Sequence, residues 1–185
     1  GLQKEFYAKH ALPTSPFVCC ENAEEIAEAI QTGKFAYPFV QKLRKGGYDG
    51  RGVSLINSSE DTLLNGTSMI EQKVDIDKEI AVIAARNSAG EVRCFPAVEM
   101  TFNDQTNLVE EIFCPANITQ EQANTAEALA IDIIEKFDMV GLLAIEFFID
   151  KQGQILINEV APRPHNSGHH TIDSVVTSQL EQLLR

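Results

Sequence analysis

Apolar and polar residues recur along the chain with the spacings of short helices and short strands. Helices are predicted in five segments, namely residues 5–12, 22–30, 58–64, 119–137 and 172–184. The longest, 119–137, carries apolar residues at helical spacing. Asn22 is expected to cap the second helix and Gly33 to end it. Thr119 and Gln122 are spaced as a capping box.

Strands are predicted in eight segments, namely residues 37–43, 53–56, 69–74, 79–86, 92–98, 108–113, 142–149 and 154–160. From residue 77 onward the predicted strands become longer and mostly antiparallel. Helices and strands in this order predict an α+β fold of two lobes that meet near residue 74. The smaller lobe is expected to span residues 1–73, and the larger lobe residues 74–185.

Two acidic residues interrupt the otherwise apolar hairpin predicted for residues 142–160. If Ile149 faces Leu156, Glu146 falls directly opposite Glu159. Like charges that face each other across two strands destabilise the pairing. A divalent cation such as Mg²⁺, shared with the phosphates of a nucleotide, would remove that repulsion. The alternative is a register shifted by one residue, which leaves the carboxylates on separate faces at solvated strand ends.

The composition limits the kinds of partner. The chain has 185 residues and a formal net charge of −12. This charge argues against nucleic acid, because phosphate backbones are bound by clustered lysine and arginine. No apolar run approaches the roughly 20 residues of a membrane span, so no membrane partner is expected. Four basic residues within ten positions nevertheless favour a small anionic ligand: Lys42, Arg44, Lys45 and Arg51.

The cysteines show no spacing typical of a zinc site or a disulfide framework; they are Cys19, Cys20, Cys94 and Cys114. A reducing cytoplasm is therefore the expected compartment. The chain begins with Gly1 instead of methionine, which suggests an excised piece of a longer protein.

Four glycines lie within residues 46–52, between two predicted strands. Glycine adds no side chain, so the backbone N–H groups there are able to approach phosphate oxygens. The Gly-Lys-Ser/Thr ending of a Walker A loop is missing, and a strand follows where that loop and the dinucleotide fingerprint require a helix. Lys42 before the loop and Arg51 within it add positive charge for phosphate or carboxylate. A merely flexible hairpin is the alternative.

Residues 71–74 lead from the first lobe to the second. An extended segment there exposes backbone hydrogen-bonding groups to a flat heterocycle, and Glu71 is able to accept from an exocyclic amine. Glu79 is a candidate for binding ribose hydroxyls. From these residues alone, an ordinary solvated strand end is the favoured interpretation.

Residues 163–170 form the most unusual segment of the chain. Two prolines flank Arg163 and keep its backbone extended. Hydrogen-bonding side chains follow at His165, Asn166 and Ser167. Neighbouring carboxylates and the lack of nearby thiols favour Mg²⁺ and an anion over zinc. For His170, packing at the start of the last helix is the favoured interpretation.

Several motifs occur together and in order: Gly-Gly-Tyr-Asp-Gly-Arg-Gly at 46–52, Glu71-Gln72, Ala144-Ile145-Glu146, Ile157-Asn158-Glu159, Ala-Pro-Arg-Pro-His-Asn-Ser-Gly-His at 161–169 and Thr-Ser-Gln-Leu-Glu at 177–181. From about residue 5 to the C-terminus, the chain closely resembles the 5-(carboxyamino)imidazole ribonucleotide synthases, which are ATP-grasp enzymes of purine biosynthesis. This family is also known as the ATPase subunit of phosphoribosylaminoimidazole carboxylase. The resemblance implies an ATP-grasp fold, with two α+β lobes and the nucleotide bound between them.

The resemblance also implies a reaction, that of an ATP-dependent ligase forming a C–N bond. In this family ATP phosphorylates bicarbonate to carboxyphosphate, and the carboxylate passes to the exocyclic amine of 5-aminoimidazole ribonucleotide. ATP and Mg²⁺ are the implied cofactors. Phosphoryl transfer depends mainly on positioning and charge neutralisation, which a bound metal and basic side chains supply.

By position, the resemblance assigns roles to residues of this chain. The expected nucleotide-binding residues are Lys42, Gly47, Tyr48, Asp49, Gly50, Arg51, Gly52, Glu71, Gln72, Val74, Glu79 and Asn158. Within this set, Glu71 and Val74 would meet the adenine and Glu79 the ribose, while Tyr48, Asp49 and Arg51 would face the imidazole substrate. The expected metal ligands are Glu146 and Glu159, with Asn158 beside them. The expected catalytic residues are Arg163, His165 and Asn166, which would hold bicarbonate or carboxyphosphate, and Arg51.

Two departures from the family pattern bear on these expectations. Phe102 stands where relatives often have histidine, so a polar contact is expected to be lost. The full-length enzymes also have an N-terminal α/β domain and a small C-terminal domain. This chain is therefore expected to be the central ATP-grasp piece of a protein that forms homodimers when complete, to bind nucleotide weakly and not to complete turnover alone.

Two competing interpretations remain. One is another ATP-grasp enzyme, such as the formate-dependent glycinamide ribonucleotide transformylase or a biotin carboxylase, and the motif from His165 to His169 argues against both. The other is a non-catalytic nucleotide sensor or a scaffold module. A nucleotide-dependent rise in melting temperature would separate a true site from a scaffold.

Overall fold

The computed structural model describes residues 1–45, 52–103 and 109–185. The chain forms two compact units, Gly1–Asp75 and Ile76–Arg185. Both units combine helices with antiparallel sheet, which confirms the predicted α+β class.

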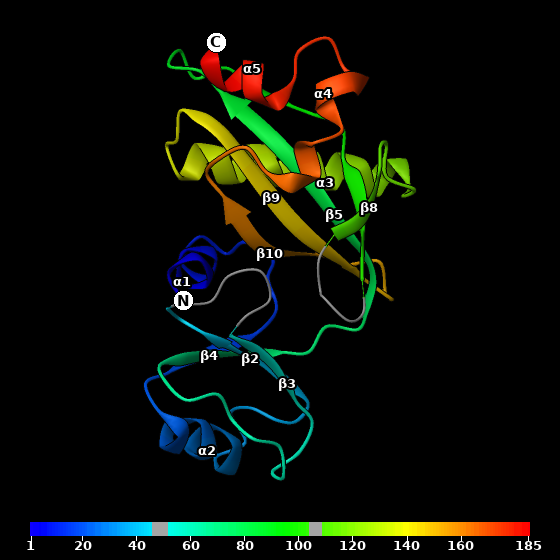
Figure 1. The fold of residues 1–185 in the computed structure, drawn as a ribbon. Coiled ribbons are helices and arrows are strands. Elements are labelled where there is room, and N and C mark those ends of the chain that lie inside the picture. Colours follow the sequence, from blue (N-terminus) through cyan, green and yellow to red (C-terminus); the bar gives the residue numbers. More distant parts are fainter. Residues whose placement is uncertain (46–51, 104–108) are drawn as a thin grey trace. The chain divides into compact units, whose positions relative to one another are not determined.

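The first unit contains a four-stranded sheet and two helices (Figure 1). Its elements in chain order are α1 (Leu2–Lys9), β1 (Phe17–Cys20), α2 (Ala23–Gln31), β2 (Phe39–Leu43), β3 (Val53–Ile56) and β4 (Ser68–Gln72). The strand order is β1-β4-β2-β3, and every neighbouring pair is antiparallel. The hairpin of β2 and β3 therefore brackets the glycine-rich segment, as the sequence predicts.

The two helices of this unit cover opposite faces of its sheet (Figure 1). α2 contributes Ile26 to a core that includes Phe39 and Ile70 on one face. Glu71 and Lys42 lie on the other face, where the α1 side chain of Lys4 is buried against Glu71. Helix α2 is capped as expected, because the Asn22 side chain accepts a hydrogen bond from the Glu25 backbone at 3.0 Å.

The second unit is built on a larger antiparallel sheet. Its elements are β5 (Ile76–Arg86), β6 (Val92–Cys94), β7 (Val98–Phe102), β8 (Val109–Phe113), α3 (Gln120–Lys136), β9 (Gly141–Asp150), β10 (Ile155–Ala161), the 3₁₀ turn η1 (Asn166–Gly168), α4 (Thr171–Ser174) and α5 (Gln179–Leu184). The strand order is β10-β9-β5-β7-β8, and β6 pairs with β5.

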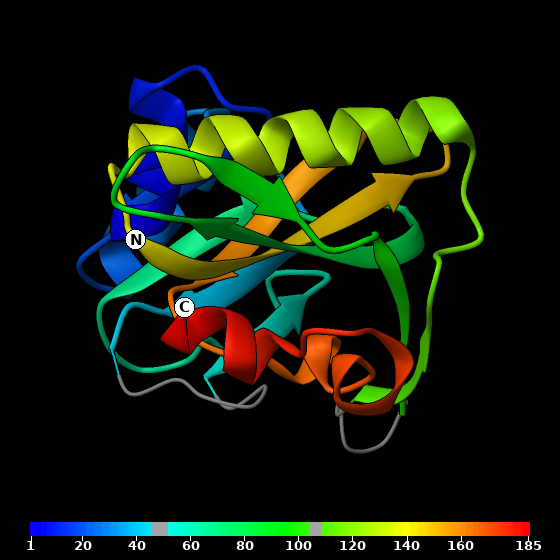
Figure 2. The same cartoon turned by 90° about the horizontal axis from the view of Figure 1, so that it is seen from above.

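Helix α3 runs along one face of the larger sheet, and α4 and α5 lie on the opposite face (Figure 2). The predicted capping box is present: Thr119 accepts from the Gln122 backbone at 3.2 Å, and the Gln122 side chain accepts from the Thr119 backbone at 3.0 Å. The α3 residues Ala126, Ala130 and Ile133 are fully buried. Within the described ranges, no helix has the length and apolar character needed to cross a bilayer.

The first helix is Leu2–Lys9 instead of 5–12, and the strand β1 was not predicted. Three further predicted elements were wrong in detail. Residues 58–64 form bends and turns instead of a helix, because the Asp61 carboxylate accepts from the backbones of Asn57 and Ser58 at 2.6 and 3.2 Å. The strand predicted at 92–98 is two strands, β6 and β7, which both pair with β5. The last predicted helix is also divided, because Ser178 caps a new helix, α5.

Candidate functional site

The pairing of β9 with β10 differs from the predicted register. Ile149 pairs with Ile155 instead of Leu156, so the first part of the hairpin is displaced by one residue. The register then shifts between Ile157 and Val160, where the strand contains a bulge. The strict pairing predicted from the alternation of side chains was therefore wrong, because a bulge adds one residue that no alternation reveals.

The bulge changes what Glu146 faces. It leaves Asn158 and Glu159 together opposite Glu146, where the prediction had Glu159 alone. Asn158 Nδ2 donates to Glu146 Oε2 at 3.4 Å. Glu146 is largely shielded, with its side chain 16% exposed, whereas Glu159 is exposed. A carboxylate and an amide thus meet where a like-charge pair was expected.

His165 completes this group of side chains. Its Nε2 lies 3.3 Å from Glu146 Oε1, and its Nδ1 accepts from the Ser167 backbone at 3.3 Å. A ring nitrogen that accepts carries no proton, so the neutral ring has its proton on Nε2, directed at Glu146. Burial, reinforced by the charges of Arg163 and His169, lowers the pKa of His165. The site therefore holds a neutral imidazole that donates to a carboxylate.

This pKa shift predicts a pH dependence. Because the folded chain binds a proton at His165 less readily than the unfolded chain does, the free energy of unfolding falls as pH drops below about 6.5. We expect the His165 ring resonances to titrate in NMR spectra with a midpoint below 6.5, with assignment by their loss in His165→Gln. A midpoint at or above 6.5 would contradict the buried, neutral ring.

A buried glutamine fixes the backbone of His165. Gln179 Oε1 accepts from the His165 N–H at 2.9 Å, and Gln179 Nε2 donates to the His165 carbonyl at 2.8 Å. The Thr171 hydroxyl links the same region, since it accepts from the Gln179 backbone at 2.9 Å and donates to the Gly168 carbonyl at 2.6 Å. A side chain on Gly168 would overlap Gln179 and Ile83.

The role of Gln179 was missed from the sequence. It appeared there only as part of the Thr-Ser-Gln-Leu-Glu motif at 177–181. Its burial is visible only in the structure, where Gln179 at the start of α5 is 2% exposed.

Of the other residues named in the 163–170 segment, Arg163 and Asn166 are exposed, His170 is half-buried and Ser167 is fully buried. Arg163 is exposed and donates through Nη1 to the Pro164 carbonyl at 3.0 Å. Asn166 is exposed at the start of η1. His170 directly precedes α4, and its Nδ1 lies 2.9 Å from Ser174 Oγ. Of these residues, the structure brings only His165 into contact with Glu146.

The sheet register adds a further oxygen donor to the same face. Ala81 pairs with Glu146, and Glu79 pairs with Phe148. Paired residues and residues two apart along a strand share a face, so Glu79 and Glu146 project from the same side of the sheet. In the described parts of the chain, no three histidine, cysteine or acidic side chains converge as a complete metal site. One or two oxygen ligands from the protein are sufficient for Mg²⁺, because waters and substrate phosphates supply its other ligands.

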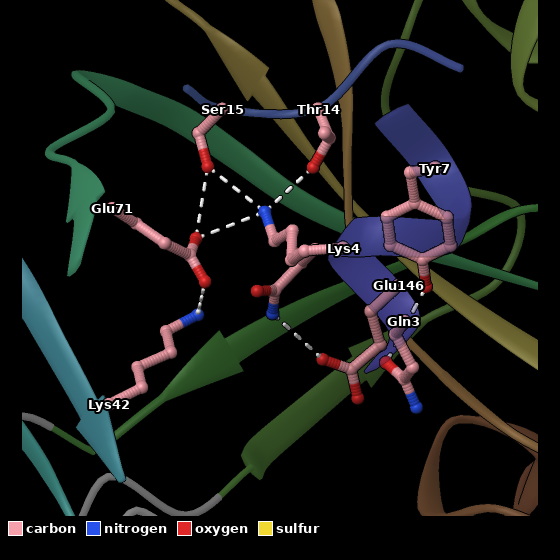
Figure 3. Close-up of polar contacts among 9 residues, drawn as sticks. Gln3, Lys4, Tyr7, Thr14, Ser15, Lys42, Glu71 and Glu146 are labelled. Atoms are coloured by element: carbon pink, nitrogen blue, oxygen red, sulfur yellow. Dashed lines mark hydrogen bonds and ion pairs between the residues drawn. The ribbon is translucent and has the colours of Figure 1, made fainter. Parts of the chain in front are cut away.

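The first unit carries the predicted phosphate-binding lysine. Val40 pairs with Glu71 across β2 and β4, so Lys42, two residues further, lies on the same face as Glu71. Lys42 Nζ is 3.2 Å from Glu71 Oε1, and Lys4 Nζ is 3.0 Å from Glu71 Oε2 (Figure 3). Glu71 is 3% exposed, so its interpretation as a solvated strand end was wrong.

Burial alone would raise the pKa of Glu71. The ammonium groups of Lys42 and Lys4, with hydrogen bonds from Lys4 and Ser15, outweigh that effect and hold the pKa below its ordinary value. The Glu71 carboxylate is therefore ionised and engaged by cations, which leaves the backbone of residues 71–74 as the part of this segment suited to a heterocycle.

The remaining predicted residues are placed as follows. Gln72 ends β4 with its side chain exposed, and Val74 is half-buried beyond the strand. Gly52 accepts from the Leu43 backbone at 2.8 Å with a φ of 80°, a conformation that favours glycine. Phe102 packs against an apolar cluster that includes Met100. Outside the described residues lie Gly47, Tyr48, Asp49, Gly50 and Arg51.

Comparison with known proteins identifies this arrangement. The ATP-grasp domain profile matches residues 5–180, which is nearly the whole chain. The chain belongs to the ATP-grasp family. Glu146 and Asn158 on the larger sheet, and His165 in the segment after β10, therefore belong to an ATP-grasp domain.

Among ATP-grasp proteins, the chain matches the N5-carboxyaminoimidazole ribonucleotide synthases. It is 34% identical to the Bacillus subtilis N5-carboxyaminoimidazole ribonucleotide synthase over 177 residues, which cover 92% of this chain and 46% of that protein. The chain thus spans less than half the length of this relative. The resemblance expected from the motifs, and the ATP-grasp fold, are confirmed.

Solved structures agree with this assignment. The Thermotoga maritima N5-carboxyaminoimidazole ribonucleotide synthetase is 39% identical, with a TM-score of 0.85 over 100% of this chain and 46% of that one. The Aspergillus clavatus synthase, in complex with ADP and 5-aminoimidazole ribonucleotide, is 27% identical, with a TM-score of 0.87 over 99% of this chain and 49% of that one.

Proposed function

We propose that this chain supplies the ATP-grasp part of an enzyme that uses ATP and bicarbonate to carboxylate 5-aminoimidazole ribonucleotide in purine biosynthesis. The observation that carries the proposal is the contact of His165 with Glu146, beside the Asn158 amide, in a domain of this family. A neutral hydrogen-bond donor next to a shielded carboxylate suits a site that binds an anion and a cation together.

The residues at the β9–β10 bulge fit a magnesium ion. Glu146 and Glu159 supply carboxylate oxygens and Asn158 an amide oxygen, which is the donor chemistry that Mg²⁺ prefers. When bound, the ion would neutralise charge on the phosphates during phosphoryl transfer. In the first unit, Lys42 would bind phosphate oxygens, while Gln72 and Val74 would meet the adenine through the extended backbone. Glu79 would accept from the ribose.

The segment after β10 would bind bicarbonate, the second substrate. Arg163 and Asn166 are exposed and offer charged and neutral donors to bicarbonate. His165 would donate to the same anion or to Glu146, because its Nε2 carries the proton. Bicarbonate would be phosphorylated by ATP, and the resulting carboxyphosphate would pass its carboxylate to the substrate amine. Tyr48, Asp49 and Arg51 would contact the imidazole ribonucleotide.

The fragment is expected to retain binding without complete turnover, because it spans less than half of its relatives and the complete protein is proposed to act as a homodimer. The test is the melting temperature of this chain with ATP, with and without Mg²⁺. A ligand at 100 times its Kd adds about 2.7 kcal/mol of stability, and each kcal/mol raises Tm by roughly 2–4 °C for a chain of this size. No magnesium-dependent rise at millimolar ATP would overturn the proposal and favour a scaffold.

A further inference from the structure

Lys4 is buried and its hydrogen-bonding capacity is fully used. An ammonium group has three donors. Lys4 Nζ reaches Thr14 Oγ1 at 2.6 Å, Ser15 Oγ at 3.0 Å and Glu71 Oε2 at 3.0 Å (Figure 3). The residue is 3% exposed, so it has neither a spare donor nor open access for a ligand. Any influence of Lys4 on a ligand must therefore pass through the groups that it holds.

The two oxygens of Glu71 are held very differently. Oε2 takes the Lys4 ammonium and also accepts from the Ser15 hydroxyl at 2.9 Å. Oε1 has Lys42 at 3.2 Å, but within the described residues it accepts no well-aligned hydrogen bond. Lys42 therefore interacts with Oε1 mainly through charge and not through a directed hydrogen bond. Its side chain is also 25% exposed, against 3% for Lys4.

Charge explains why two lysines share one carboxylate. With Lys42 alone, Glu71 would form a one-to-one ion pair, and in a buried setting the attraction between such charges is several-fold stronger than in water. Lys42 would then be neutralised and tied to the strand. With Lys4 present, a cation that is fully enclosed balances the carboxylate, and the cluster keeps a net positive charge at its more exposed lysine.

We propose that Lys4 is a positioning residue for phosphate binding: it locks and neutralises Glu71, so that Lys42 is oriented by the carboxylate yet retains its positive charge for an anionic phosphate. This inference rests on the proposed function, in which Lys42 binds the phosphates of a nucleotide. The resemblance assigned no role to Lys4. The alternative is an ion pair that only anchors α1 to the sheet.

The experiment measures the Kd of Mg·ADP by calorimetry for the wild-type chain, Lys4→Met, Lys4→Arg and the matched control Lys9→Met, which alters an exposed lysine of the same helix. We expect Lys4→Met to weaken binding roughly tenfold, because Lys42 then becomes, among the described residues, the sole cation that balances the Glu71 carboxylate and is held in that ion pair. Lys4→Arg should restore most of the affinity, and Lys9→Met should leave it unchanged.

Combining Lys4→Met with Glu71→Gln separates positioning from anchoring. The same double variant is useful if Lys4→Met alone fails to fold. Removing one partner of a buried ion pair is strongly destabilising, whereas the double variant removes both charges. In the background of Glu71→Gln, Lys42 no longer has a carboxylate to neutralise it. Lys4→Met should therefore change the Kd less than threefold there, by the logic of a double-mutant cycle. An equal loss in both backgrounds, or a folded Lys4→Met with wild-type affinity, would overturn the inference while leaving the proposed function intact. Failure of the wild-type chain to bind Mg·ADP would overturn both.

Discussion

Glu146→Gln is expected to abolish the magnesium-dependent part of nucleotide binding. The amide keeps the shape of the side chain, and its oxygen still accepts from His165 Nε2, so the fold should be retained. It removes the negative charge that a divalent cation requires. At ATP 100 times the wild-type Kd the ligand stabilises the wild-type chain by about 2.7 kcal/mol in total, and the magnesium-dependent part of this stabilisation should be lost. The measurement is the difference in melting temperature with and without Mg²⁺, at constant ATP.

The bulge makes this prediction specific to Glu146. Glu146 is shielded and contacted by His165 and Asn158, whereas Glu159 is exposed, so Glu159→Gln should cause a smaller loss. Glu135→Gln, at an exposed position of α3, is the matched control and should have no effect. If Glu146→Gln kept the full magnesium-dependent shift, the metal proposal for this face would fail.

Gln179→Leu is expected to destabilise the chain by about 1–3 kcal/mol, which is the cost of leaving one buried polar group without a partner. The substitution keeps the size of the side chain but leaves the N–H of His165 without its bond at 2.9 Å. The His165 carbonyl loses its bond at 2.8 Å and retains the one from the Gly168 N–H at 3.0 Å. Denaturation in urea followed by circular dichroism measures the loss, since the chain has no tryptophan.

Gln182→Leu provides the control on the same helix and should change stability by less than about 0.5 kcal/mol. The NMR resonances of His165 give a second measurement, because loss of the clamp should move the ring out of its buried setting and raise its pKa toward the ordinary value. Equal stability of Gln179→Leu and Gln182→Leu would show that the clamp does not fix the segment.

Local sequence signals predicted those elements whose stabilising contacts are themselves local. The capping box of Thr119 and Gln122 and the cap at Asn22 join residues three apart, so their spacing alone defined two helices. The wrong helix at 58–64 shows the limit of such signals, since the Asp61 side chain binds nearby backbone groups and replaces helical bonds.

The candidate site was predicted as a set of residues, through motifs, but not as a set of contacts. Alternation along β9 and β10 could not reveal the bulge, which inserts one residue and exchanges the partner of Glu146. Glu71 was expected to be solvated because its partners are distant in sequence, with Ser15 56 positions away. The Gln179 clamp likewise bridges 14 positions.

Sequence alone was enough to establish the α+β class, the capped helices, the basic segment before the glycine-rich loop and the family to which the motifs belong. The folded structure was needed to show that Glu146 faces Asn158 and His165, that two lysines share Glu71, and that Gln179 holds the histidine backbone. The physical reason is that capping and periodicity act between neighbours in sequence. Ionisation and hydrogen-bond partners depend instead on burial and on which distant groups the fold brings within about 3 Å of one another.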